Sequence, residues 1–288
     1  MIDVLTLNYN DSSTTINFVK SVESYRCVGR ILVVDNCSTD DSLNLLKKLE
    51  SDRVLVISND KNGGYGAGNN LGIRYLYNNL RSNFILLANP DVVVEESVLE
   101  CVCTFLKEND DYAIAAPVMT DLNGKIQYNT AFKIPTLWSF LMSFELLLSK
   151  TFKPFKYEDA ILERKPFVDV CAVSGSMFMM NVEKMVKYGM FDENVFLYCE
   201  EHILGVKLAK AGVKTALLTS LRFIHNHSVS IGKSYKSIFS RNKILNASRI
   251  YVLKKYYNAN SVVLFIARIL SKVNLLESFL VDVIKRWI

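Results

Sequence analysis

The first 90 residues alternate between short apolar runs and segments with helical spacing. Three apolar runs, each followed by a polar loop, occupy residues 3–7, 30–34 and 54–58. The helix-like segments after these loops occupy residues 15–25, 42–49 and 69–79, and a fourth apolar run follows at 84–87. Strands alternating with helices of this length form βαβ units with right-handed crossovers. The sequence therefore predicts an α/β fold with a mainly parallel central sheet flanked by helices.

Polar residues follow the predicted strands at the points where the strands end. Asn8 and Asp35 follow the first two strands, a glycine-rich loop at 62–68 follows the third, and Asp91 follows the fourth. Open α/β folds bind ligands at the carboxyl edge of the sheet, so we expect these residues to lie together. Pro90 cannot donate to a strand ladder, and the break before Asp91 is therefore structural. A simple Asx turn is the alternative for this segment.

The loop at 62–68 contains Gly63, Gly64, Gly66 and Gly68. These glycines leave backbone amides unobstructed, and the loop leads into a helix N-terminus, an environment that favours a diphosphate. The loop has neither the GxxxxGK[ST] pattern of ATP sites nor a GxGxxG after the first strand, which argues against ATP and dinucleotides. A flexible connector is the alternative.

The second half of the chain gives weaker patterns. Residues 135–166 have no period of two, and we expect a helical or mobile insertion there. Strand character returns at 167–173 and 175–180. Between them, residues 174–176 (Ser-Gly-Ser) either shape a pocket or mark a bulge where the backbone approaches another element closely.

The basic residues are concentrated at the C-terminus. The net charge is +5, but residues 233–288 carry 11 Lys and Arg against 2 Asp and Glu, interleaved with Ile, Leu and Tyr. Such a surface suits an anionic membrane leaflet. Nucleic acid is the rival partner for a basic stripe, but no nucleic-acid recognition motif accompanies it, and we expect none to bind. A solvated face on helices packed against the rest of the chain is the simpler alternative.

Cysteine usage and hydropathy indicate the compartment. The six cysteines form no CxxC pair, which is typical of reduced thiols in a cytosolic protein and does not indicate a zinc site. The chain begins directly in a strand pattern, without a charged or cleavable leader. The longest apolar run near the C-terminus, residues 262–267, is far short of the ~20 residues of a membrane span. We therefore expect a cytoplasmic protein, peripheral at most on the inner face of the membrane.

Seven motifs occur in one order along roughly residues 2–230: LNYN, VVDNCSTD, NGGYGAGNNLGI, LLANPDVVV, VSGSMFMM, FDENVFLYCEEHILG and HNHS. In this combination the chain resembles the family 2 glycosyltransferases, especially their rhamnosyltransferase-like bacterial members. The resemblance implies a GT-A fold over residues 1–232, with a nucleotide-sugar-binding half at 1–118 and an acceptor-binding half at 119–232. Residues 233–288 would form a basic, amphipathic helical region.

The resemblance also implies roles for the residues at the predicted sheet edge. Asp35 would contact a uracil or thymine base. The other residues implied in nucleotide binding are Asn8, Gly63, Gly64, Asn69 and Asn89. Asp91 stands in the place of the family's DxD motif and would bind Mg²⁺ or Mn²⁺, with Asn89 replacing the first Asp. His225 and His227 are candidates to complete that metal site, since alternate residues of a strand share a face; a strand-end His is more often structural.

In the family, an acidic pair supplies the general base, which places that role on Glu201 with Glu200 as its helper. Adjacent carboxylates in a partly apolar cleft can raise one another's pKa toward the working pH. The alternative is that both only stabilise a helix N-terminus. Two carboxylates also suit a glycoside hydrolase. A hydrolase, however, needs neither an aspartate that contacts a nucleotide base, as Asp35 would, nor one that binds a metal, as Asp91 would. A single base with no carboxylate nucleophile implies inversion at the anomeric carbon.

The implied donor is a pyrimidine nucleotide sugar, a dTDP- or UDP-sugar, with dTDP-rhamnose first and UDP-hexose or UDP-galactofuranose as alternatives. The implied acceptor is a polyprenyl-diphosphate-linked glycan of a bacterial surface polysaccharide. A second hypothesis is a catalytically silent nucleotide-sugar-binding protein. It is motivated by Asn89 and by Ile203, where relatives commonly have an acid.

Overall fold

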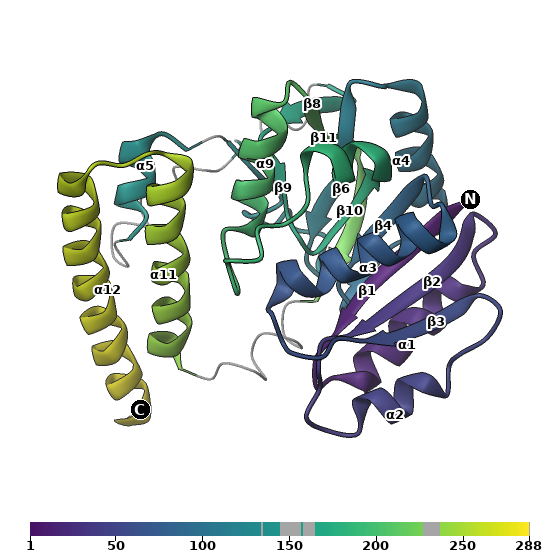
Figure 1. Ribbon diagram of the computed structural model, residues 1–288, viewed down its shortest axis with the longest axis horizontal. Coiled ribbons are helices and arrows are strands. Elements are labelled where there is room, and N and C mark those ends of the chain that lie inside the picture. Colours follow the sequence, from purple (N-terminus) through teal and green to yellow (C-terminus); the bar gives the residue numbers. More distant parts are fainter. Residues whose placement is uncertain (134, 145–156, 158–164, 227–236, 288) are drawn as a thin grey trace.

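The computed structural model describes residues 1–287 except 134, 145–156, 158–164 and 227–236. Its centre is a nine-stranded sheet in the order β3-β2-β1-β4-β10-β6-β11-β5, with β8 paired to β11. Helices cover both faces of this sheet, and two long C-terminal helices stand beside it (Figure 1).

The N-terminal half has the predicted βαβ organisation. Its parallel strands are β1 (Ile2–Asn8), β2 (Val28–Asp35), β3 (Val54–Ser58) and β4 (Phe84–Ala88). The connecting helices are α1 (Ser12–Glu23), α2 (Ser42–Lys47) and α3 (Tyr65–Leu80). The chain adds β2 and β3 on one side of β1 and β4 on the other, so the topological switch point lies between β1 and β4. That is where open α/β sheets bind ligands.

The second half of the sheet is mixed rather than parallel. Its strands are β5 (Val92–Val93), β6 (Tyr112–Thr120), β8 (Phe167–Val170), β10 (Met177–Asn181) and β11 (Lys214–His225). β10 runs antiparallel between β4 and β6, β11 is parallel to β6, and both β5 and β8 are antiparallel to β11. A separate two-stranded sheet joins β7 (Ala131–Phe132) to β9 (Ala172–Val173).

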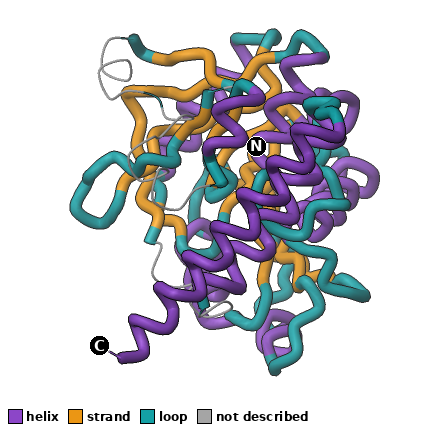
Figure 2. The backbone as a smooth tube through the Cα atoms, turned by 90° about the vertical axis from the view of Figure 1, so that its left-hand side faces the viewer, coloured by secondary structure: helices purple, strands orange, loops and turns teal. Residues whose placement is uncertain are grey.

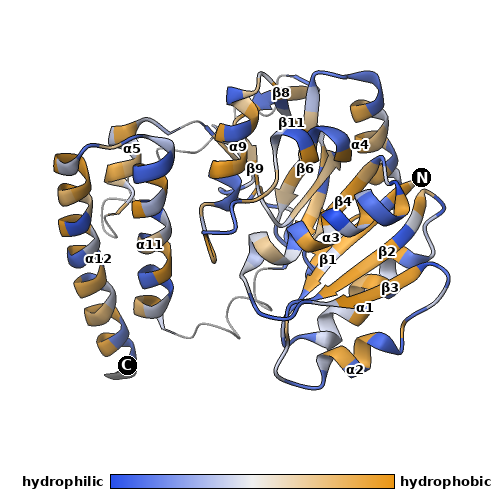
Figure 3. Cartoon of the chain, in the orientation of Figure 1, coloured by the Kyte–Doolittle hydropathy of each residue, from blue (hydrophilic) through white to orange (hydrophobic). Residues whose placement is uncertain are grey.

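Both faces of the sheet are buried. On β2, Ile31 and Val33 enter one apolar cluster, while Leu32 and Val34 enter the other. This explains the continuous apolar runs of the sequence, because a strand buried on both faces does not alternate (Figure 3). The first cluster includes side chains of α1, α2 and α4 (Glu96–Glu108), and the second includes those of α3, α8 (Val182–Tyr188) and α9 (Glu200–Lys210).

The predicted helical C-terminal region is confirmed as α11 (Ile238–Tyr256) and α12 (Ser261–Trp287). The two helices meet the rest of the chain through a third apolar cluster, which includes Phe140 and Leu141 of α5 (Leu137–Met142) and Ile203 of α9. The expected insertion at 135–166 contains α5, and most of the remainder lies outside the described residues. No helix in the described ranges is long and apolar enough to cross a bilayer.

Candidate active site

Strand register brings the first two candidates side by side. Asn8 pairs with Asp35 across β1 and β2, and the Asn8 Nδ2 donates to Asp35 Oδ1 at 2.8 Å. Ser38 donates its hydroxyl to Oδ1 at 2.6 Å and its amide to Oδ2 at 2.9 Å. Asp35 is only 1% exposed, so its carboxylate is held rigidly by protein donors. A carboxylate oxygen can accept two hydrogen bonds, which leaves Oδ2 able to take a second donor.

The glycine loop departs from the expected open anion cradle. The Gly64 amide donates to Asn62 Oδ1 at 3.0 Å, and the Tyr65 amide donates to Phe196 O at 3.1 Å. A Cβ on Gly64 would lie 2.0 Å from Phe196 O, and φ at Gly64 is +90°, so glycine is required for this close approach. The expectation of unobstructed amides is therefore wrong at Gly64 and Tyr65.

The other two glycines of the predicted loop lie inside α3, which begins four residues earlier than the pattern predicted. Gly66 packs on Phe191, where a Cβ would come within 2.9 Å, and Gly68 packs on Leu7, where it would come within 2.5 Å. Their function is close helix packing. Asn69 is also buried in α3, and its Nδ2 donates to Tyr65 O at 3.0 Å.

Two buried asparagines that the sequence analysis missed tie these loops together. Asn36 Nδ2 donates to Asn62 Oδ1 at 3.0 Å and to Gly64 O at 3.2 Å. Asn70 exchanges hydrogen bonds with the backbone of Phe191, donating from Nδ2 at 3.0 Å and accepting at Oδ1 at 2.9 Å. Both lie in motifs noted in the sequence, VVDNCSTD and GAGNN. In those motifs the predicted site residues were Asp35, the glycines and Asn69.

The turn after β4 places Asp91 against the end of β11. β5 pairs with β11 so that Val92 faces His225, and Asp91 Oδ1 lies 3.1 Å from His225 Nε2. Both side chains are nearly buried, at 3% and 7% exposure. Asn89 is half-buried, and its amide donates to Ser176 O at 2.7 Å. The strand ends at His225, and His227 lies outside the described residues.

The pair of Asp91 and His225 fits a divalent cation. A carboxylate oxygen and an imidazole nitrogen already face each other, and both are ligand types that divalent cations take in proteins. Within the described residues no group of three or more His, Cys, Asp or Glu side chains could hold a metal ion. The remaining ligands would have to come from donor oxygens and water, as in sites that bind a metal together with a phosphate substrate.

The acidic pair begins α9 after a strained turn. Tyr198 and Cys199, the two residues before Glu200, both lie in the left-handed region at φ +72° and +69°. Each such non-glycine residue costs roughly 1–2 kcal/mol, and strain of this kind concentrates at functional sites. Glu200 is 3% exposed, and its Oε1 has no hydrogen-bond partner in the described part of the chain.

Gly175 connects this pair to the rest of the site. Its amide donates to Glu201 Oε1 at 3.1 Å, and its carbonyl accepts a hydrogen bond from the Tyr65 hydroxyl. A Cβ on Gly175 would lie 2.7 Å from Glu201 Oε1. Of the two alternatives for residues 174–176, the structure therefore has the close backbone approach. Through the neighbouring contact of Ser176 with Asn89, this segment joins α9 to the turn that holds Asp91.

Both carboxyls are harder to ionise than an exposed glutamate. Burial raises the pKa of Glu200 well above its ordinary 4.5, and the charge of Glu201 adds to the rise. Burial also raises the pKa of Glu201, against the opposing effect of its backbone hydrogen bonds, including the one from Gly175. Burial, and then the charges of Glu201 and Glu200, raise the pKa of Tyr65. A base with a raised pKa accepts a proton more readily at neutral pH.

His202 follows the acidic pair directly, and the charge of Arg249 acts on Cys199 and His202, the residues on either side of the pair. Neither His202 nor Arg249 was among the predicted site residues. Burial, and then the charge of Arg249, lower the pKa of His202 to about 4, so this imidazole is neutral at pH 7. Its ring lies 4.7 Å from that of Phe132. Arg249 lies on α11, far from the acidic pair in sequence. It is one of many basic residues in the C-terminal region, so nothing in the sequence indicated this placement.

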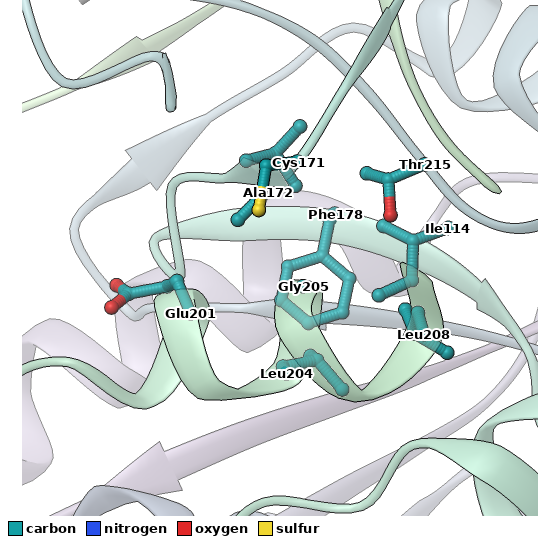
Figure 4. Close-up of a pocket in the computed structure, with 10 residues that line it drawn as sticks. Ile114, Cys171, Ala172, Phe178, Glu201, Leu204, Gly205, Leu208 and Thr215 are labelled. Carbon is teal, nitrogen blue, oxygen red and sulfur yellow. The ribbon is translucent and has the colours of Figure 1, made fainter. Parts of the chain in front are cut away.

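Figure 4 shows the Glu201 carboxylate pointing away from a small apolar cavity between α9 and the sheet, lined by residues such as Phe178 and Leu204. The cavity measures about 10 Å³, room for no more than one water molecule. It is a packing defect behind the acidic pair rather than a sugar pocket.

A parallel half-sheet with its ligand edge at the β1–β4 switch point, continued by a mixed half that supplies the acidic helix, is the GT-A architecture. The sequence profile of glycosyl transferase family 2 matches residues 3–186, and the chain belongs to this family. The resemblance seen in the motifs is thus confirmed.

Two characterised relatives are similar in sequence. The chain is 29% identical over 170 residues to rhamnosyltransferase WbbL of Escherichia coli (strain K12), an alignment that spans 56% of this chain and 60% of WbbL. It is 22% identical over 256 residues to the low-salt glycan biosynthesis hexosyltransferase Agl10 of Haloferax volcanii, spanning 87% of this chain and 76% of Agl10.

Solved structures share the fold. GalNAc-T7 with UDP, GalNAc and Mn²⁺ superposes with a TM-score of 0.60 at 14% identity, covering 78% of this chain and 44% of that one. Mannosyltransferase PcManGT from Pyrobaculum calidifontis, in complex with GDP-Man and Mn²⁺, gives 0.58 at 11% identity, covering 96% and 73%. S. aureus TarS 1–349 with UDP-GlcNAc gives 0.54 at 15% identity, covering 86% and 66%. At these identities the similarity is one of fold alone.

Proposed function

We propose that this protein is an inverting, metal-dependent glycosyltransferase that uses a pyrimidine nucleotide sugar, with dTDP-rhamnose as the first candidate. The observation that carries the proposal is the connection through residues 174–176. It joins the turn holding Asp91 to the raised-pKa carboxylate of Glu201 at one edge of the sheet. A donor-binding group and a general base that contact one shared segment suit transfer between two bound substrates.

Glu201 would act as the general base. The acceptor hydroxyl attacks the anomeric carbon, its proton passes to the Glu201 carboxylate, and the bond to the diphosphate oxygen breaks with its electron pair leaving on the nucleotide. Gly175 holds one carboxylate oxygen at 3.1 Å and so fixes the orientation of the group. Burial maintains the raised pKa of this carboxyl, and Gly175, which donates to it, is held in turn by the Tyr65 hydroxyl.

Donor binding would use the other side of the same edge. Asp35, oriented by Asn8 and Ser38, would accept a hydrogen bond from the ring N–H of uracil or thymine at Oδ2. Asp91 and His225 would hold Mn²⁺ or Mg²⁺ together with diphosphate oxygens. A cation held there would supply positive charge against the charge that builds on the departing nucleoside diphosphate. Gly63, Asn69 and Asn89 remain nucleotide-binding proposals at this edge.

The proposed acceptor is a lipid-linked glycan at the cytoplasmic face of a membrane, in the synthesis of a bacterial surface polysaccharide. The support is the 29% identity to a rhamnosyltransferase and the basic C-terminal region. UDP-hexose and UDP-galactofuranose are the alternative donors.

The test is donor turnover with a panel of dTDP-rhamnose, UDP-glucose, UDP-galactofuranose and GDP-mannose, each with Mn²⁺ and a polyprenyl-diphosphate-linked monosaccharide. We expect nucleoside diphosphate to be released from one pyrimidine donor, and the product sugar to be inverted. Release from GDP-mannose alone would overturn the assignment of Asp35 to a pyrimidine. Binding of a donor in a thermal-shift assay without release under any condition would instead indicate a silent nucleotide-sugar-binding protein.

A further inference from the structure

The large apolar side chains of α12 point outward. Figure 1 places α12 at the outer edge of the molecule with α11 between it and the sheet, and in Figure 2 the helix ending at the C-terminus crosses in front of the rest. Phe265 is 62% exposed and Leu276 is 60% exposed. The other exposed apolar residues of this helix, which together form its outer row, are Val262, Ile266, Ile269, Val273, Phe279, Leu280 and Ile284.

The face that α12 turns toward α11 is instead small and polar. Its buried residues are Ala267, Ser271, Asn274 and Ser278. Asn246 of α11 donates to Asn274 Oδ1 at 2.9 Å, and Asn242 donates to Ser278 Oγ at 2.7 Å. The polarity of α12 is therefore reversed with respect to a helix of a water-surrounded protein, which buries its apolar side.

This reversal is maintained along most of the helix. At the far end, Asp282 caps α11 by accepting hydrogen bonds from the amides of Ile238 and Phe239 at 3.0 and 2.9 Å. Polar contacts therefore join the two helices at Asn246 and at Asp282, beside an apolar contact in which Val263, Leu264 and Leu270 of α12 pack against the third cluster. The outer row takes no part in either set of contacts and needs another apolar environment. A helix of 27 residues is about 40 Å long, so the row exceeds the scattered apolar exposure normal for a monomer.

The charges beside the row indicate which environment. Arg268 and Lys272 are exposed and one turn apart, and at 3.6 residues per turn they lie along one edge of the outer row. Lys285, near the end of the helix, is also exposed, but its helical position places it on the side of α12 opposite the row. The two acids of α12, Glu277 and Asp282, are partly buried, and Asp282 is engaged as the cap. The outer face therefore combines apolar side chains with positive charge, the pattern of helices that lie in the interface of anionic membranes.

We propose that α12 lies in the plane of an anionic lipid surface, with its outer row in the boundary between headgroups and acyl chains. Arg268 and Lys272 would reach the phosphate groups with their apolar stems along the row. A second copy of this chain is the rival occupant, but pairing two such rows side by side would bring like charges together. The inference deepens the lipid-linked acceptor of the proposed function and rests on it only for the location of the substrate.

The connection to the acidic helix gives this surface a consequence for the site. Tyr251 and Tyr256 of α11 donate to Asp192 Oδ2 at 2.8 and 2.6 Å, and Lys255 Nζ lies 2.9 Å from the same oxygen. Ser248 donates to Leu197 O at 2.8 Å. Because α11 holds both α12 and the loop before Glu200, a membrane-bound α12 fixes the orientation of the acidic pair relative to the lipid.

The experiment is vesicle flotation of the full chain, without donor or metal, so that its outcome is independent of glycosyl transfer. Vesicles contain either phosphatidylcholine with 30% phosphatidylglycerol or phosphatidylcholine alone. We expect flotation with the anionic vesicles, reduced by 0.5 M salt, and at least about tenfold weaker partition for Phe265→Glu/Leu276→Glu. The matched control is Leu122→Glu, at a residue 66% exposed in the turn after β6, which should float as the unaltered chain does.

Circular dichroism and thermal melting establish that the double variant is folded, which is expected because both positions are exposed. The proposal would be overturned if the unaltered chain floated with neither vesicle type. It would also be overturned if the double variant floated with the anionic vesicles as strongly as the unaltered chain. Light scattering after gel filtration measures the oligomeric state and so tests the alternative that a second copy covers the outer row. A dimer that the double substitution disrupts, together with no vesicle binding, would assign the row to a second copy.

Discussion

Asp91 Oδ1 and His225 Nε2 lie 3.1 Å apart although 134 residues separate them in the chain. The short pairing of β5 with β11 creates this contact, because it returns the segment after Asp91 across the sheet to the end of β11. Two elements that local sequence patterns treat as unrelated thus supply the two halves of one candidate metal site.

This contact predicts that Asp91→Asn and His225→Ala each weaken Mn²⁺ binding by at least about tenfold while the fold is retained. Removing either donor leaves one protein ligand of this pair, so the cation would depend on the nucleotide diphosphate for its remaining non-water ligands. Mn²⁺ electron paramagnetic resonance titration in the presence of dTDP or UDP measures the change directly. Asp52→Asn, at an exposed loop residue, is the control. Unchanged Mn²⁺ affinity in both variants would remove these residues from the metal site.

Glu201→Gln is expected to lower kcat by about 10²–10⁴ with little change in donor affinity, because the amide cannot accept the proton of the acceptor hydroxyl. Gln retains an oxygen for the Gly175 amide, so the local structure should persist. Single-turnover kinetics and donor binding by calorimetry separate the two effects. A variant that keeps its full rate would show that the base lies elsewhere.

Gly175→Ala should reduce kcat by about 10–100-fold, since its Cβ would come within 2.7 Å of Glu201 Oε1 and displace the carboxylate. Gly124→Ala is the comparison. There the φ of +76° costs about 1 kcal/mol of stability, but no atom lies within 4 Å of the new Cβ. The measurement is kcat of each variant, normalised to the concentration of folded protein. Equal kcat values for the two variants would contradict the positioning role of Gly175.

Glu200→Gln is expected to stabilise the protein at neutral pH. Burial raises the pKa of Glu200 in the folded state above its ordinary 4.5, so ionising this group costs folding free energy as the pH rises past that value. The variant removes this cost, and about 1 kcal/mol moves Tm by roughly 2–4 °C in a protein of this size. Melting curves from pH 4 to 8 should show the gain at high pH and its disappearance near pH 4.

Asp192→Asn should have the opposite pH dependence. Burial alone would raise the pKa of Asp192, but hydrogen bonds from Tyr256, Lys255 and Asn194 outweigh it and hold the pKa well below the ordinary 3.8. The stabilisation is therefore present above pH 3.8 and is lost as the pH falls. Because Lys255 is 48% exposed, the loss at pH 7 is about 1–3 kcal/mol rather than that of a fully buried pair. Urea unfolding measures it, with Asp52→Asn as the unaffected reference.

Sequence patterns predicted the N-terminal half well because its signals are local. Each strand of that half is a buried aliphatic run followed by a turn, so the strand order places Asn8 beside Asp35 as expected. The pattern placed the start of α3 too late because glycines are normally counted as loop residues. Here Gly66 and Gly68 are helical. Glycine occupies these helical positions because a Cβ would come too close to Phe191 and Leu7.

The parts of the site that the sequence did not predict come from long-range contacts. Nothing in the local pattern around Gly175 indicates that its peptide group lies between Tyr65 and Glu201. Arg249 belongs to a stripe of basic residues, and only the docking of α11 brings its charge near His202. The exposed apolar row of α12 was likewise not predicted, because the apolar residues of a helix are expected to face inward. Only the packing of α12 against α11 shows that this row faces outward.

The position of β10 between β4 and β6 limits how enzymes of this shape can be recombined. A chimaera cut after residue 118 would divide β6 (Tyr112–Thr120) and would place the β10 of a relative between β4 and β6, so that side chains not matched to each other would meet on both faces of the sheet. Attempts to change sugar selectivity by exchanging whole halves between relatives should therefore give insoluble protein. Grafts confined to the connections at the carboxyl edge of the sheet leave every strand paired and are the exchanges that this topology permits.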